Sequence, residues 1–103
     1  PNVEVREAAA LRIDEIYRYT RSRWGREQAS QYVEGLFEAF ERIARRHPAF
    51  STVPAEFGVA GHTARYAHHV IYWRRTREGK VHIVTVLHER MHQIDRLRDD
   101  FGL

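Results

Sequence analysis

Two apolar stripes with helical spacing, divided by Gly25, constrain the fold of this chain more than any other feature. From about Ala8, apolar or weakly polar side chains return every three or four residues. The first stripe consists of Ile13, Ile16, Tyr17, Thr20 and Trp24. The second consists of Ala29, Tyr32, Val33, Leu36, Phe37, Phe40, Ile43 and Ala44. Gly25 is typical just past a helix end, and Pro48 stops the second helix. So short a link predicts an antiparallel helical hairpin.

The rest of the chain has the pattern of strands. Residues 2–6 predict a short strand, and "HTARY", "HVIYWRR" and "KVHIVTVL" predict three more after the hairpin. In the last of these, Val81, Ile83 and Thr85 alternate with His82, Val84 and Val86. Apolar residues on both of its faces indicate a central strand covered by helices. Residues 48–61 contain Pro48, Pro54, Gly58 and Gly61 and are predicted to form a loop.

After Leu87, the spacing of Met91, Ile94, Leu97 and Phe101 suggests a short terminal helix. The predicted fold class is therefore α+β, in the order β-α-α-β-β-β. The helical hairpin packs on a small, largely antiparallel sheet, and a short C-terminal helix follows. With 103 residues, the chain is expected to form a single domain over residues 1–103.

Composition narrows the function classes. Without cysteine, neither disulfides nor thiolate metal sites are available, which fits a reducing cytoplasm. No apolar run approaches the roughly 20 residues of a membrane span, so a cytoplasmic protein is expected. Lys80 is the only lysine among 17 basic residues, and the net charge is +3. Arginine suits carboxylates, phosphates and protein interfaces, so this charge permits an acidic partner without requiring nucleic acid. We expect no direct sequence-specific binding of nucleic acid.

The segment "TVLHERMHQI" contains the pattern H-E-x-x-H at His88, Glu89 and His92. On a helix, this pattern places two imidazoles on one face, where they can bind zinc beside a general base. Here His88 directly follows a predicted strand and Arg90 would lie beside the metal. A third ligand, from His62, His68 or His69, is not demanded by the spacing. We therefore interpret the match as an accident of a histidine-rich chain, and expect neither a metal nor another cofactor.

The same segment resembles the C-terminal signature L-H-x-R-M-D of the ParE branch of the RelE/ParE toxin superfamily. The matching residues are Leu87, His88, Arg90 and Met91, and His92 stands where the family usually has Asp. The strand "HHVIYWR" is similar to the family's H-x-I-x-Y-R, with Trp73 in the Tyr place and Arg74 after it. The two predicted helices resemble its D-x-I-x-x-Y-T, W-G-x-x-Q-A and Y-x-x-x-L patterns. Those matches are Asp14, Ile16, Tyr19, Thr20, Trp24, Gly25, Gln28, Ala29, Tyr32 and Leu36.

This resemblance implies a toxin of a type II toxin–antitoxin pair, neutralised by a ParD-like antitoxin that folds across its surface. It implies DNA gyrase as the target and inhibition, rather than chemistry, as the action. The alternative is a RelE-like, ribosome-dependent mRNA endonuclease, which needs a base, an acid and cations for the phosphate. His88, His92, Arg65, Arg74 and Arg90 could nominally supply these groups. RelE-type sites, however, generally use Lys or Glu and a late Tyr, and this chain has no Tyr after Tyr72.

Two sets of site residues follow from the resemblance and the residue types. The candidates for target binding and toxicity are Arg65, Arg74, His88, Arg90 and His92. The candidates for antitoxin binding are Tyr17, Trp24, Tyr32, Phe37 and Phe40. Each has a structural alternative. His88 can simply hydrogen-bond backbone at a strand end, and the arginines can pair with Asp95, Asp99 or Glu78. Most of the aromatic residues are expected in the hairpin core, and Met91 is expected in the core as well.

Overall fold

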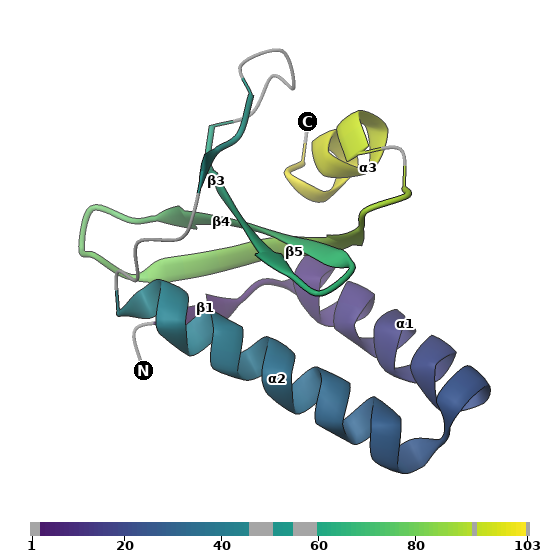
Figure 1. The fold of residues 1–103 in the computed structure, drawn as a ribbon. Helices are drawn as coiled ribbons and strands as arrows, with labels where there is room; N and C mark the ends of the chain where they lie inside the picture. Colours follow the sequence, from purple (N-terminus) through teal and green to yellow (C-terminus); the bar gives the residue numbers. More distant parts are fainter. Residues whose placement is uncertain (1–2, 46–50, 55–59, 92, 103) are drawn as a thin grey trace.

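The computed structural model describes residues 3–45, 51–54, 60–91 and 93–102. Figure 1 shows a sheet between a pair of long helices on one face and a short helix on the other. The elements are β1 (Val3–Val5), α1 (Glu7–Trp24), α2 (Arg26–Ala44), β2 (Ser51–Thr52), β3 (His62–Tyr66), β4 (His69–Arg75), β5 (Val81–His88) and α3 (Gln93–Asp100). The predicted α+β class, the helical hairpin and the short terminal helix are confirmed.

The strands lie side by side in the order β1-β5-β4-β3-β2. β1 pairs with β5 in parallel, and the other neighbours are antiparallel, so β5 is central as predicted. The prediction that residues 48–61 form only a loop is wrong at β2, which pairs with Thr63 and His62. A strand of two residues is too short for a periodic pattern, and it forms here because β3 offers a free edge.

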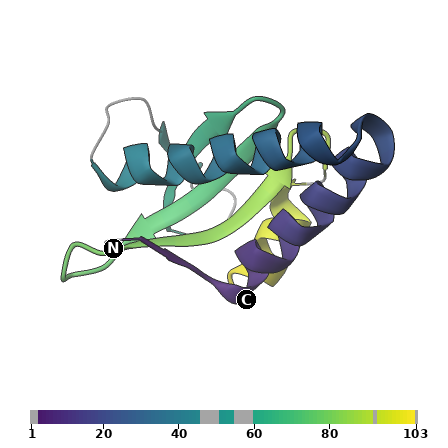
Figure 2. The same ribbon diagram turned by 90° about the horizontal axis from the view of Figure 1, so that it is seen from below.

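The helical hairpin covers one face of the sheet, and the two views in Figures 1 and 2 agree on this arrangement. Gly25 joins the helices with φ of 95°, a backbone conformation that residues with a side chain rarely adopt. The core beneath the hairpin contains Ala9, Ile13, Ile16, Leu36, Ala39, Phe40, Ile43, Ile71, Trp73, Val81, Ile83 and Val86. Because both apolar stripes point into this core, its burial is the main stabilising contribution to the fold.

The opposite face of the sheet carries α3 over a smaller cluster of Val53, Tyr72, Leu87 and Leu97. Polar contacts add to this packing at both ends of the helix. The Tyr72 hydroxyl donates to Gln93 Oε1 at 2.6 Å, and the buried Thr85 hydroxyl donates to Asp100 Oδ2 at 2.7 Å. Arg12 of α1 also donates from Nε to Asp100 Oδ2, at 3.0 Å, and so connects the hairpin to α3.

An irregularity between β4 and β5 sets which face each β5 side chain occupies. Tyr72 pairs with Thr85 but Trp73 pairs with Ile83, so Val84 is an extra residue in β5. After this bulge the alternation is reversed. Thr85 therefore lies on the α3 face, whereas Val86 joins the core under the hairpin. The sequence-based grouping of Thr85 with Val81 and Ile83 is wrong for this reason.

Membrane insertion finds no support in the helices. Within the described segments, none of the helices combines the length and the apolar character needed to cross a bilayer.

Candidate functional site

Three histidines gather where β4 begins and β5 ends. Antiparallel pairing places His69 opposite His88, and their rings meet edge to face with centroids 5.1 Å apart. The His68 ring stacks on His88 at 6.4 Å. We call His68, His69 and His88 the histidine cluster. Residues twenty apart in the chain are brought together here by strand register alone.

An ion-pair network surrounds the exposed side of the histidine cluster. Glu89 accepts hydrogen bonds from Arg65 Nη1 at 2.7 Å and from His68 Nδ1 at 3.0 Å. The hydrogen bond from His68, followed by that from Arg65, lowers the pKa of the Glu89 carboxyl. The Glu89 amide also donates to the His68 carbonyl at 2.9 Å. Because these side chains are largely in water, the network orients the strand ends more than it stabilises the fold.

His69 lies on the protected side of the cluster, beneath α2. Its Nδ1 shares a hydrogen bond of 2.7 Å with the Tyr32 hydroxyl. Burial, followed by the neighbouring His88 and His68, lowers the pKa of His69 from 6.5 to about 4. Burial raises the pKa of the Tyr32 phenol. Both groups are therefore neutral at pH 7, and the pair fastens the β3–β4 turn to the helical hairpin.

His88 and Arg90 lie at the exit from β5. The backbone N–H of Arg90 donates to His88 Nδ1 at 3.1 Å, so the neutral imidazole carries its proton on Nε2. A hydrogen bond to backbone at the strand end is the structural alternative predicted for His88 from the sequence, and this contact is present. The Arg90 side chain is exposed, and within the described residues it forms no ion pair. Its guanidinium is thus available to an acidic group of a partner.

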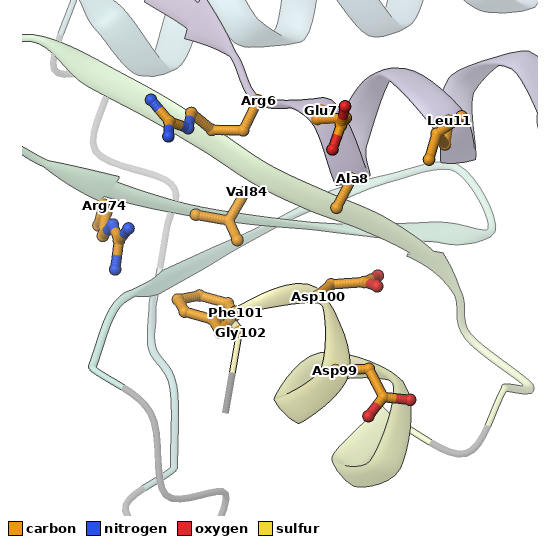
Figure 3. Close-up of a pocket in the computed structure, with 10 residues that line it drawn as sticks. All are labelled: Arg6, Glu7, Ala8, Leu11, Arg74, Val84, Asp99, Asp100, Phe101 and Gly102. Atoms are coloured by element: carbon orange, nitrogen blue, oxygen red, sulfur yellow. The ribbon is translucent and has the colours of Figure 1, made fainter.

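Of the five target-binding candidates, the structure brings Arg65, His88 and Arg90 to one end of the sheet. Arg74 lies on β4, opposite His82 of β5. It is five residues from His69, or about 16 Å along the strand at about 3.3 Å per residue. There it packs over the Phe101 ring at 5.6 Å and lines a cavity of about 340 Å³ between α1, the sheet and the end of α3. Figure 3 shows this cavity, with Arg6 and Glu7 on its other side. His92 lies outside the described residues.

The H-E-x-x-H pattern does not lie on one helix. His88 is the last residue of β5, and a turn separates it from α3, which begins at Gln93. Glu89 is engaged by Arg65 and His68 instead of facing a metal. Among the residues that the structure describes, no group of three or more His, Cys, Asp or Glu side chains could hold a metal ion.

The antitoxin-binding candidates differ in exposure. Trp24 is 67% exposed and Phe37 is 44% exposed, whereas Tyr17 and Tyr32 are half-buried. Phe40 is only 1% exposed and supports Phe37 from below, with ring centroids 5.3 Å apart. Trp24 and Phe37 therefore present the larger apolar surfaces in this set.

Several residues that complete these surfaces were not among the sequence-based candidates. His69 and Glu89 hold the histidine cluster together, and Leu11 and Tyr19 add exposed apolar area to α1. A correct register for β4 and β5 would have found the cluster, because His69 begins one predicted strand and His88 directly follows the other. Leu11 and Tyr19 lie outside the apolar stripe of α1, so the helical spacing that predicted the core could also have indicated their exposure.

Comparison with known proteins places this fold in a family. The family described as "ParE toxin of type II toxin-antitoxin system, parDE" matches residues 3–93. Toxin ParE1 of Mycobacterium tuberculosis is 35% identical over 89 residues, which are 86% of this chain and 89% of that protein. Toxin ParE of Escherichia coli is 33% identical over 84 residues, covering 82% and 81% of the two chains.

A third relative, Toxin ParE1 of Caulobacter vibrioides, is 32% identical over 79 residues, or 77% of this chain and 79% of that protein. The two long helices, the mixed sheet and the short C-terminal helix are consistent with RelE/ParE-like toxins. The chain belongs to the ParE toxin family of type II toxin–antitoxin systems.

Proposed function

We propose that this chain inhibits DNA gyrase and that a ParD-like antitoxin neutralises it. The observation that carries this proposal is the family match, which extends over both helices and all strands to residue 93. No cofactor is part of the proposal, because inhibition requires only a complementary surface.

The proposed antitoxin surface is the exposed apolar part of the helical hairpin that includes Trp24 and Phe37. Large exposed apolar side chains of this kind are typical of surfaces that a partner covers. A disordered antitoxin tail could fold against them and bury their area. A net charge of +3 on the toxin would favour an acidic tail. Phe40 contributes by supporting Phe37 rather than by direct contact.

The proposed target surface is the strand end that carries Arg65, His88 and Arg90. Arg65 is partly neutralised by Glu89, whereas Arg90 makes no ion pair within the described residues. Arg90 is therefore expected to contribute the most to binding an acidic group on gyrase. Arg74 and His92 stay predictions, the first because it lies at a separate place on the sheet.

Gyrase supercoiling in vitro tests the proposal, with the toxin freed from its antitoxin and the antitoxin then added back. Inhibition with accumulation of cleaved DNA, reversed by antitoxin, is the expected result. Arg90→Ala should weaken inhibition about tenfold, the effect of losing a charged contact worth about 1.4 kcal/mol. Arg77→Ala is the matched control, because Arg77 is an exposed arginine in the turn between β4 and β5, and its loss should change inhibition less than twofold.

Antitoxin binding is tested separately with variants of the hairpin. Trp24→Ser and Phe37→Ser should each weaken antitoxin binding about tenfold or more, as expected for exposed aromatic anchors. Both variants should still inhibit gyrase. Unchanged antitoxin affinity in both variants would place the antitoxin elsewhere on the toxin, and intact supercoiling with every variant and the parent chain would reject gyrase as the target.

A second candidate function is the ribosome-dependent cleavage of mRNA, and the histidine cluster is the observation that favours it. His88 lies close to His68 and His69, and Arg65 is hydrogen-bonded to the adjacent Glu89, so an imidazole and a guanidinium could act on one phosphate. The half-buried His69 is neutral and hydrogen-bonded to Tyr32, and His68 is hydrogen-bonded to Glu89, which leaves His88 as the candidate base. Cleavage of mRNA on purified ribosomes, lost in His88→Ala and retained in Arg77→Ala, would establish this function.

A further inference from the structure

Residues 18–27 form one of two short segments in which positive charge is concentrated, the other being residues 74–80 in and after β4. Residues 18–27 contain Arg18, Arg21, Arg23 and Arg26 against a single acid, Glu27. Four arginines and one glutamate give this segment a net charge of +3, which equals the formal charge of the whole chain. The remaining residues are balanced. We call residues 18–26 the arginine tip, since they span the end of α1, the Gly25 link and the start of α2.

The arginine tip projects away from the rest of the molecule. Figures 1 and 2 both show the link between α1 and α2 extending beyond the edge of the sheet. Trp24 lies eleven residues after Ile13, which is about three helical turns, so the two side chains are on nearly the same side of α1. Ile13 is buried under the hairpin, but Trp24 is 67% exposed because the sheet ends before reaching it. An apolar stripe thus continues into a region where none of the described segments covers it.

Most of these guanidinium groups have no acidic partner in the described parts of the chain. Arg18 pairs with Asp14 at 2.8 Å, while Arg21, Arg23 and Arg26 form no ion pair there. Arg23 lies over the ring of Tyr19, with its guanidinium carbon 5.8 Å from the centroid, and Tyr19 is 60% exposed. The helix dipole accounts for cations at the end of α1, but a cation at the start of α2 opposes it. Helix stability therefore does not explain Arg26.

We propose that the arginine tip binds single-stranded DNA. Unpaired guanidinium forks match the geometry of phosphate oxygens, and successive phosphates along a strand could each meet one arginine. Trp24 and Tyr19 are the aromatic side chains of this segment and both are mostly exposed, and unstacked bases pack on such rings without sequence preference. A duplex hides the faces of its bases, so it would leave these two rings unused. With Glu27 as the only carboxylate, the segment offers few acceptors for the 2′-hydroxyl of RNA.

This inference goes beyond the proposed inhibition of gyrase and does not depend on it. The residues that carry it are the arginines, Tyr19 and Trp24 of the hairpin end, whereas the proposed target surface is the strand end around Arg90. Trp24 is shared with the proposed antitoxin surface, and the arginine variants leave it unchanged. Variants of one surface leave the other in place, so the two proposals can fail separately.

Fluorescence anisotropy of the full chain with labelled (dT)15, measured over a series of salt concentrations, tests the inference. Each phosphate neutralised on a single strand contributes about −0.7 to the slope of log K against log salt. Three contacts therefore predict a slope near −2 for the parent chain, and the triple variant Arg21→Gln, Arg23→Gln, Arg26→Gln should lose most of this slope and at least tenfold in affinity at low salt.

A charge-matched triple variant provides the control. Arg77→Gln, Arg96→Gln and Arg98→Gln remove the same charge from exposed positions in the β4–β5 turn and in α3. This variant should keep the slope and bind within about twofold of the parent chain. If both triple variants lose affinity equally, the binding reflects only net charge and the inference is wrong. Circular dichroism establishes that both variants are folded.

Tryptophan fluorescence tests the stacking. The chain has two tryptophans, and Trp73 is 1% exposed, so any quenching by (dT)15 reports Trp24. Quenching by (dT)15 but not by poly-glutamate or by phosphatidylserine vesicles is expected. Tighter binding of either of those probes, a preference for (U)15, or binding of (dT)15 without quenching would overturn the assignment to single-stranded DNA.

Discussion

The two faces of the sheet are covered by different means. Under the helical hairpin, two long helices bury a continuous set of aliphatic and aromatic side chains that includes Leu36 and Trp73. On the other face, α3 has eight residues, covers a smaller cluster and is anchored at its ends by hydrogen bonds to Tyr72 and Thr85. Hydrophobic burial is cooperative and tolerant of small shifts, whereas a few polar anchors hold an element only at defined points. Damage to the core under the hairpin should therefore lower the stability of the whole fold, whereas damage on the other face should increase local unfolding of α3.

The largest expected effect comes from the hairpin face. Leu36→Ala removes a completely buried side chain from the centre of the core and should lower the free energy of unfolding by about 3 kcal/mol. Phe37→Ala, one residue further along α2 and 44% exposed, should cost less than about 1 kcal/mol. Urea denaturation followed by circular dichroism measures both. Similar losses in the two variants would mean that the hairpin does not bury its core as described.

A smaller and more local effect is expected on the α3 face. Asp100→Ala removes the acceptor of both Thr85 and Arg12 and should cost about 2 kcal/mol, because a buried hydroxyl loses its partner. Hydrogen exchange should accelerate in α3 while the amides of α2 keep their protection. Asp99→Ala, an exposed neighbour, serves as the control. Equal acceleration in both helices would show that the two faces unfold together.

The free energy of unfolding should depend on pH through His69, which joins the helical hairpin to the sheet. Its pKa is about 4 in the folded chain and near 6.5 when unfolded, so the unfolded chain binds more protons between these values. This contribution to stability is complete above pH 6.5, declines as the pH falls and is lost below pH 4. Between pH 7.5 and 4.5, the parent chain should lose about 2 kcal/mol more than His69→Gln. Parallel curves of unfolding free energy against pH would contradict the buried, neutral imidazole.

The smallest effect on stability is expected at the arginine tip. Trp24→Ser should change the free energy of unfolding by less than about 0.5 kcal/mol, because the side chain is mostly in water. Urea denaturation followed by circular dichroism measures this change. A large loss of stability would show that Trp24 packs within the hairpin and is not available to a partner.

Much of this architecture could be predicted from local patterns. The stripe that ends at Ala44 predicts α2 because apolar residues return along it every three or four positions. Strand β4 is predicted by its β-branched and aromatic residues, and Arg65 and His88 were both selected as site candidates. The site could not be assembled in the same way. His69 is a half-buried partner of Tyr32, which precedes it by 37 residues, and no local pattern records such a contact.

The sequence by itself determined the helical hairpin, the four longer strands and the family, because periodicity, turn residues and motif order are properties of neighbouring residues. Only the tertiary structure decided that Val84 bulges and turns Thr85 toward α3, and that Ser51 and Thr52 extend the sheet. It also separated Arg74 from Arg65 and left Trp24 beyond the sheet. These outcomes depend on register and on where elements end relative to one another. Both are set by contacts between residues far apart in the chain, whose energies no local pattern contains.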